Sequence, residues 1–411
     1  LRQIELASMN QDQIAEFEML SGMLDELNGR TAEALESYGR VIAADRRATT
    51  PEAVLRTISL LDELGRLDVG RAVDTLSAQA AIWRGDRIEL AIIEKLTDLQ
   101  YRNGNFRDAF SLTRQAAEIY DNSDVLARLM SRAQVEFSGL YIDGQANALD
   151  AIEALSIYYD FRQLTPAGND GDQMIRNLAQ RLIRVDLLDQ AAELLEYQVE
   201  NRLQGAARTQ IAADLAVVYI ANREPARALK ILYDTRLTGL PPALERQRRV
   251  LEARALVDAG RYDLALDMLA GMSGRDTELL RADAYWKARR HREAAETIET
   301  LYSADLERGS LSPIARMNVI KAAVGYVLAN DQLGLARLRN RYSDIMSRAP
   351  EWPMFAFVTD TVDTSATEFR ELARQIAATD SLNAFLNAYR EIYTAEGAIT
   401  PFRATQEEGL S

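Results

Sequence analysis

The sequence predicts an all-α fold built from repeated pairs of helices. Apolar residues recur three and four positions apart in many segments, which is the spacing of one helix face, as in Ile211, Leu215 and Val218. Most of the nine prolines lie between such segments, where they do not interrupt a helix. The sequence contains no alternating β-branched runs bounded by hairpin turns. These three observations favour helices throughout.

A recurring unit divides these helices into pairs. Each copy has a helix, a turn that opens with Gly or a polar residue, and a small residue five positions later that begins a second apolar stripe. Gly at the turn allows the positive φ that ends a helix, and the small residue lets the second helix approach the first closely. Clear copies lie at 29–34, 104–109, 186–191, 223–228, 260–265, 289–294 and 331–336, and weaker ones at 65–70 and 144–149.

The nine copies indicate one continuous array. From Ala34 to Ala336 the small residues are about 38 positions apart on average. A helix pair of this size cannot bury its own apolar stripe, so each pair must stack on its neighbours. The 411 residues would also be enough for two or three separate domains, but the repeat favours an α-solenoid of about nine helical hairpins.

These residues resemble the tetratricopeptide repeat (TPR) family. The small and large residues that TPR helices place at their close contacts have counterparts in Gly22, Ala34 and Tyr38, in Ala216, Tyr219 and Ala228, in Ala253, Leu256 and Ala265, and in Ala282, Tyr285 and Ala294. The consensus aromatic residue of the first helix and the Pro that ends a repeat are mostly missing, and the repeat length varies from about 29 to 42. The resemblance implies a right-handed α-solenoid with irregular curvature.

The array divides into four expected parts. Residues 1–163 hold about four TPR-like repeats and residues 164–348 about five. Amphipathic helices are expected near 366–379 and 381–394, and we interpret 349–396 as a helical cap that covers the last repeat. The polar residues 397–411 are expected to form a flexible tail.

Composition excludes several kinds of chemistry. The chain has no Cys, which rules out disulfides, thiolate nucleophiles and Cys-ligated metals. His291 is its only His, so a site that needs two imidazoles cannot form. The net charge of −14 argues against nucleic-acid binding, which needs clustered cations. There is no apolar run long enough to span a membrane and no Gly-rich phosphate loop.

Acidic pairs are the remaining catalytic candidates. Pairs such as Asp25/Glu26, Asp62/Glu63, Glu193/Glu196 and Asp258/Asp263 lie on helix faces or turns that we expect to be exposed. Glycoside hydrolysis needs two carboxylates across a cleft, one of them with a raised pKa. We therefore predict no enzyme activity, no catalytic residues, no metal and no cofactor.

The TPR resemblance implies that the first helix of each pair lines a concave groove. Mixed apolar and polar residues there would hold an extended or helical peptide. The predicted groove residues are Met19, Met23, Glu94, Asp98, Tyr101, Arg176, Gln180, Gln210, Val217, Gln247, Arg254, Asp283 and Trp286. In TPR receptors for chaperone tails a carboxylate clamp of Lys, Asn and Arg lines this groove, but only Lys321 matches it and Gly325 stands where Asn is needed.

Two basic stretches form a predicted docking spot for an acidic partner. It consists of Arg246, Arg248, Arg249, Arg281, Arg290 and Arg292. The alternative is a solvated helix face carrying Glu–Arg pairs four residues apart, such as Glu245 and Arg249.

The sequence thus favours a non-catalytic scaffold or adaptor that binds a protein segment in its groove. Only four of the 48 cationic residues are Lys, and this Arg-rich composition is typical of GC-rich bacteria. We expect a bacterial envelope, secretion or motility assembly, and the start at Leu1 favours the periplasm or cell envelope over the cytoplasm. The alternatives are a helical superstructure of a larger protein with a catalytic or membrane domain, and an all-α carbohydrate-active enzyme.

Overall fold

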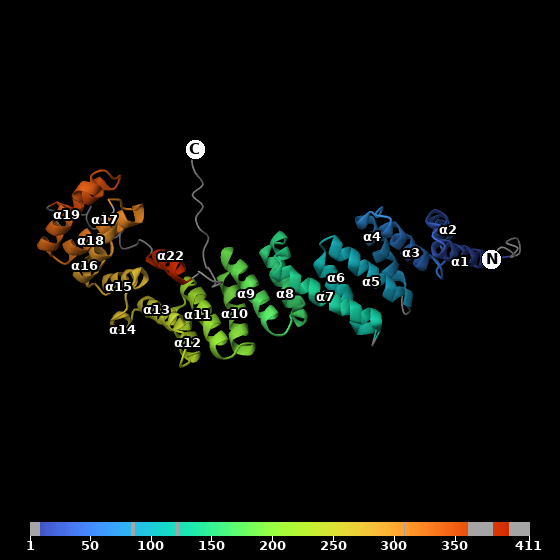
Figure 1. Ribbon diagram of the computed structural model, residues 1–411, viewed down its shortest axis with the longest axis horizontal. Helices are drawn as coiled ribbons and strands as arrows, with labels where there is room; N and C mark the ends of the chain where they lie inside the picture. Colours follow the sequence, from blue (N-terminus) through green and yellow to red (C-terminus); the bar gives the residue numbers. More distant parts are fainter. Residues whose placement is uncertain (1–8, 84–86, 121–122, 308, 361–380, 394–411) are drawn as a thin grey trace. The chain divides into compact units, whose positions relative to one another are not determined.

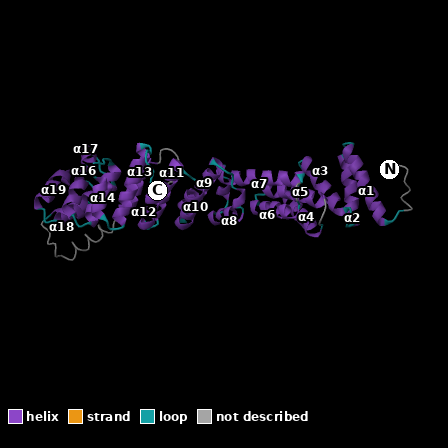
Figure 2. Ribbon diagram, turned by 90° about the horizontal axis from the view of Figure 1, so that it is seen from below, coloured by secondary structure: helices purple, strands orange, loops and turns teal. Residues whose placement is uncertain are grey.

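The chain folds into paired helices that form two compact units. The computed structural model describes residues 9–83, 87–120, 123–307, 309–360 and 381–393, and every regular element within them is a helix (Figures 1 and 2). The units are Leu1–Met174 and Ile175–Ser411. The expected all-α repeat fold is confirmed. The helix expected near 366–379 and the tail 397–411 lie outside the described residues.

The first unit contains the first four helix pairs. Within each described pair a short turn joins the helices, and the first helices also pack on one another, α3 on α5 and α5 on α7. The helices are α1 (Gln11–Leu27), α2 (Thr31–Ala44), α3 (Thr50–Glu63), α4 (Val69–Ile82), α5 (Arg87–Arg102), α6 (Phe106–Ile119), α7 (Asp124–Ile142) and α8 (Ala151–Asp160), with the 3₁₀ turns η2 (Gln145–Ala148) and η3 (Arg162–Leu164).

The second unit continues the same pattern. Helix α9 contains the division between the units, and first helices again pack on one another, α11 on α13 and α13 on α15. The helices are α9 (Asn169–Arg184), α10 (Leu188–Asn201), α11 (Gly205–Ala221), α12 (Pro225–Asp234), α13 (Pro242–Asp258), α14 (Tyr262–Leu269), α15 (Arg275–Lys287), α16 (His291–Leu301), α17 (Ser303–Glu307), α18 (Pro313–Leu328), α19 (Gln332–Met346), α20 (Trp352–Thr359) and α22 (Ser381–Tyr393).

The turns within the pairs share one backbone geometry. A residue with positive φ ends the first helix, and the next residue donates its backbone N–H to a carbonyl five positions back, as Arg30 does to Asp25. This bond satisfies a carbonyl at the helix end, and Gly or a short polar residue tolerates the positive φ best. The positive-φ residues are Gly29, Gly65, Gly104, Asp186, Arg223, Gly260, Arg289 and Asn330.

The small residue five positions after the positive-φ residue is buried in six of the seven clear copies. Ala34, Ala109, Ala191, Ala228, Ala265 and Ala294 are each 0% exposed, as the close approach of two helices requires. The last copy was placed one residue too late. Its positive-φ residue is Asn330 rather than Asp331, so Leu335 takes the buried place and Ala336 is exposed.

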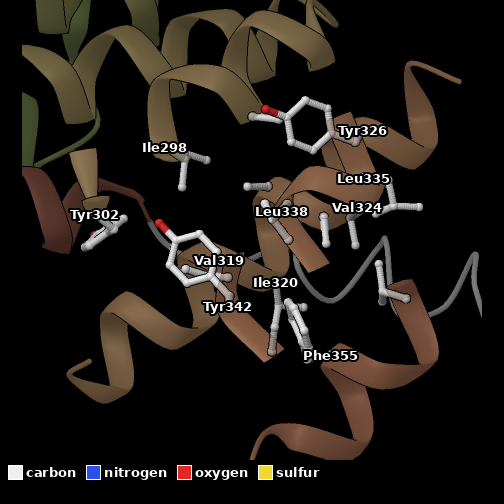
Figure 3. Packing of buried hydrophobic residues seen from close by; sticks show 14 of the residues in the cluster. Ile298, Tyr302, Val319, Ile320, Val324, Tyr326, Leu335, Leu338, Tyr342 and Phe355 are labelled. Carbon is white, nitrogen blue, oxygen red and sulfur yellow. The ribbon is translucent and has the colours of Figure 1, made fainter. Parts of the chain in front are cut away.

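The helices after the last pair go to two different places. Helix α20 packs on α18 and α19, and its Phe355 completes a core that includes Tyr326 and Tyr342 (Figure 3). Helix α22 packs on α15 instead, and in Figure 1 it lies in red beside α13. The amphipathic pattern at 381–394 therefore reports a buried face, but that face covers the middle of the unit. The part boundaries at 163/164 and 348/349 stay predictions.

Candidate functional site

Helix α22 lies against the first helices of two successive pairs. The residues that contact it are Arg246, Gln247 and Arg254 on α13 and Asp276 on α15, and Asp283 on α15 is paired with Arg254. We call these five residues the α22 face. They come from different repeats because stacking brings the same side of each first helix into line.

The buried stripe of α22 is mainly aromatic. Phe385, Tyr389 and Tyr393 are spaced four residues apart, which places them on one side of the helix. Successive rings lie 5.9 Å and 4.7 Å apart, within the range of favourable aromatic contact. Leu382 and Leu386 are buried beside them. The opposite side carries the exposed residue Asn387.

Two hydrogen bonds fix the register of α22 on the face. The Nε2 of Gln247 donates to the hydroxyl of Tyr389 at 2.6 Å, and the hydroxyl of Tyr393 donates to Oδ2 of Asp276 at 3.2 Å. Both Gln247 and Tyr389 are buried, so this bond satisfies polar atoms that water does not reach. The tyrosines thus give α22 polar anchors inside an otherwise apolar contact.

Two arginines present their guanidinium groups to the aromatic stripe. Cζ of Arg254 lies 5.3 Å from the centre of the Phe385 ring, and Cζ of Arg246 lies 5.6 Å from that of Tyr393. Cations within about 6 Å of a ring centre are attracted to its electron-rich face. The face therefore favours aromatic over aliphatic side chains at these two places.

Arg254 is the centre of a buried ion-pair network. Its side chain is 1% exposed and contacts Asp258 through two nitrogens, at 2.8 and 2.7 Å, and Asp283 at 3.2 Å. Lys287 joins the same carboxylates at 3.2 and 3.1 Å. A buried guanidinium needs such partners because an unpaired buried charge is costly. All four members belong to α13 and α15, so the network forms without any group of α22.

The network shifts the pKa values of its neighbours. Burial raises the pKa of Asp283, but Arg254, Lys287 and Lys321 outweigh it and hold that pKa below its ordinary value. Burial and the charge of Lys287 lower the pKa of Lys321, against the opposing effect of Asp283. The ammonium of Lys321 also lies 4.9 Å from the centre of the Trp286 ring. The middle of the unit thus holds interlocked charges of both signs.

Asp214 on α11 is a buried acidic group. Burial raises its pKa to about 7, although Arg176 and a hydrogen bond with Gln210 act to lower it. Burial also raises the pKa of Tyr389, and the charges of Asp214 and Asp276 add to this effect. Asp214 and the α22 anchor are therefore electrostatically linked.

The predicted groove residues of the second unit fall into two groups. Gln247, Arg254 and Asp283 meet at the α22 face, and Arg176 and Gln210 act on Asp214 at its edge. Val217 and Trp286 are buried in helix packing, and Trp286 contacts His291 with ring centres 5.2 Å apart. Gln180 is half-buried on α9.

The predicted groove residues of the first unit are joined by ion pairs and core contacts. Glu94 pairs with Arg128 at 2.8 Å and Asp98 with Arg132 at 2.8 Å, so both bridge α5 and α7. Tyr101 is buried beneath the guanidinium of Arg132. Met19 is buried and Met23 half-buried in the core of the first pair.

The arginines of the predicted basic docking spot are engaged within the chain. Arg246 pairs with Asp276, Arg281 with Glu278, Arg290 with Glu293, and Arg292 with Glu296 and Asp331. Arg248 is buried and donates to carbonyls of Thr209 and Leu232, and burial lowers its pKa. Arg249 donates to the carbonyl of Met268. The exposed pairs of Arg290 and Arg292 support the solvated-face alternative for that stretch.

The candidate acidic pairs include several carboxylates that are already paired with cations. Asp62 contacts Lys95 at 2.6 Å and Arg102 at 2.8 Å, and these bonds lower its pKa. Asp25 pairs with Arg30, and Glu196 with Arg227. A lowered pKa is the opposite of what a general acid requires.

Sequence reasoning missed the aromatic residues of α22 as part of the site. The signal was present, because Phe385, Tyr389 and Tyr393 recur every four residues on an amphipathic segment. The importance of Asp214 was also missed, since an Asp among apolar residues of α11 gives no sign of which segment buries it.

The paired helices, their shared turns and their buried small residues make this chain a TPR-like helical repeat protein. Two similar solved structures are the TPR domain of P58(IPK) and Tom70 of yeast. Each is 12% identical to this chain; the matches cover 89% and 95% of this chain and 99% and 80% of theirs, with TM-scores of 0.26 and 0.28. No protein-family model and no curated protein matches the sequence. Among the described helices, none is long and apolar enough to cross a membrane.

Proposed function

We propose that this protein is a non-catalytic scaffold that holds a helix of a partner protein on the α22 face. The observation that carries the proposal is α22 itself. A single amphipathic helix lies across α13 and α15 and is held there by apolar burial, two hydrogen bonds and two cation–π contacts. A surface that fits one helix in this way is suited to a helix-in-groove partner.

The face has the composition of a protein-recognition surface. Aromatic residues and arginines dominate the energetically important centres of protein interfaces. Here the helix supplies the aromatics and the face supplies Arg246 and Arg254. The charges of the face are paired with one another, which supports binding over catalysis because none is left as a free acid or base.

We further propose that the partner belongs to a bacterial envelope, secretion or motility assembly. The Arg-rich, Lys-poor composition supports a bacterial source.

A peptide-binding measurement tests the proposed function. The probe is a fluorescent 13-residue peptide with the sequence of α22, added to the full chain in which α22 carries F385A, Y389A and Y393A. We expect saturable binding, weakened about 3- to 10-fold by the added change Gln247→Ala, because one buried hydrogen bond is lost.

The matched control is Arg292→Ala, which removes a surface ion pair on α16. It should leave the affinity unchanged. If the folded triple variant does not bind the peptide, or if Gln247→Ala and Arg292→Ala act alike, the proposed function is wrong.

A further inference from the structure

Given a scaffold that binds helices, as proposed above, we infer that α22 is a built-in competitor of the partner. A partner would displace it with an amphipathic helix that carries aromatic residues at i, i+4 and i+8. The chain would then have two states, one with α22 on its face and one with the partner helix there and α22 released.

The first support is that α22 depends on the face more than the face depends on α22. A helix of 13 residues is marginal in water by itself, so docking stabilises it. The ion pairs of the face join α13 to α15 directly, through Arg254–Asp283 and Arg246–Asp276. They persist when α22 leaves, so its release does not strand these buried charges.

The second support is the contrast with α20, the other helix beyond the last pair. Glu351, next to α20, forms a two-bond ion pair with Arg316 of α18, at 2.6 and 3.1 Å, and Phe355 is 0% exposed in a core shared with α18 and α19. At α22, Gln247 and Asp276 bond to tyrosine hydroxyls, and water can satisfy these groups after release. Helix α20 is built into the fold, whereas α22 is suited to exchange.

The third support concerns which ligand can replace α22. The guanidinium of Arg254 faces the Phe385 ring, Gln247 meets the hydroxyl of Tyr389, and Asp276 with Arg246 meets Tyr393. A competing helix must therefore present an aromatic ring in the position of Phe385 and rings with a hydroxyl in the positions of Tyr389 and Tyr393. Tyr satisfies both requirements because it combines a ring with a hydroxyl.

Covalent attachment gives α22 an advantage over any free helix. A tethered ligand acts at an effective concentration of about 1 mM when its linker spans the distance. The apparent affinity of a partner is its affinity for the free face multiplied by the fraction of chains whose face is free. A partner should therefore bind the wild-type chain at least ~10-fold more weakly than a chain whose α22 is weakened.

The occupant is assigned to a partner protein rather than to a second copy of this chain. The chain's own α22 already reaches its face, so exchange between copies adds no contact. The net charge of −14 also opposes close approach of two copies.

The test compares one peptide on two full-length chains. The peptide has the α22 sequence with Asn387→Ala, an exposed change that gives it a distinct mass, and the chains are wild type and F385A/Y389A/Y393A. We expect at least ~10-fold tighter binding to the triple variant. Hydrogen exchange of residues 381–393 in the wild-type chain should accelerate toward the free-peptide rate as the peptide saturates it. A wild-type chain with Asn387→Ala is the control, and should bind as wild type does.

Each other result has a definite meaning. Equal affinity for both chains, with 381–393 still protected, overturns the competition but leaves the proposed function standing. Binding to neither folded chain overturns both. Concentration-dependent dimers of the wild-type chain that disappear in the triple variant would overturn the assignment to a partner protein. They would show that the helix on the face comes from a second copy of this chain.

Discussion

Close approach of the first two helices predicts opposite effects for two glycines of one pair. Gly22 in α1 and Gly39 in α2 both lie inside helices. A Cβ at Gly22 would lie 2.6 and 2.8 Å from ring carbons of Tyr38, whereas a Cβ at Gly39 would meet no atom within 4 Å. Tyr38 is fully buried and its hydroxyl donates to Glu26, so the ring cannot simply move aside.

The magnitude follows from two effects. Ala in place of Gly favours a helix by about 1 kcal/mol at either position. Overpacking of a tight contact typically costs about 1–3 kcal/mol, and only Gly22→Ala incurs it. Gly39→Ala should therefore stabilise the first pair, and Gly22→Ala should be less stable than Gly39→Ala by about 1–3 kcal/mol.

Hydrogen exchange of the backbone amides of α1 and α2 measures this difference directly, because a repeat array can unfold one pair at a time. Urea unfolding of the full chain gives a second value. The reasoning is refuted if Gly22→Ala protects these amides as well as Gly39→Ala does.

Three further predictions concern charge and backbone conformation. The pKa of Asp214 is raised to about 7 in the folded chain, so its contribution to stability is greatest at low pH and is lost as pH rises toward 7. The variant Asp214→Asn does not ionise, so its free energy of unfolding in urea should exceed that of wild type by an amount that grows as pH rises from 5 to 8, up to about 4 kcal/mol. Arg254→Met should destabilise the chain by about 3–5 kcal/mol because it strands buried carboxylates, while Arg292→Met on the surface should change stability by less than about 1 kcal/mol in the same assay. Asn330→Gly should raise the thermal midpoint, since Asn330 has a φ of 54°; an unchanged or lower midpoint would contradict this.

Much of the fold could be predicted from the sequence because its signals are local. A Gly or polar residue at a turn and an Ala five positions later determine a helix end and a close contact together, as at Gly104 and Ala109. The same rule failed by one residue at the last pair. There Asn330 has the positive φ and Leu335 is buried. The predicted residues, Asp331 and Ala336, are their neighbours in the chain and fit the same sequence pattern.

The site was harder to predict because it depends on a distant segment. Repeat register put Gln247, Arg254 and Asp283 on one side of two helices, and the structure brings these residues together. The stripe of Phe385 and Tyr389 shows that 381–393 buries one side, but an amphipathic pattern does not name its neighbour. The cap interpretation placed that side on the last pair, whereas α22 packs on α15, in the pair before it.

The central claim is that the α22 face is a helix-binding surface that α22 itself occupies. Hydrogen exchange of residues 381–393 in the wild-type chain and in F385A/Y389A/Y393A tests it most directly, with the amides of α13 and α15 as an internal reference. In the wild-type chain these amides should exchange at least ~100-fold more slowly than in the free peptide, since a helix of this length is marginal alone. Protection should be lost in the triple variant while α13 and α15 stay protected. Exchange of 381–393 at the free-peptide rate in the wild-type chain would contradict the account.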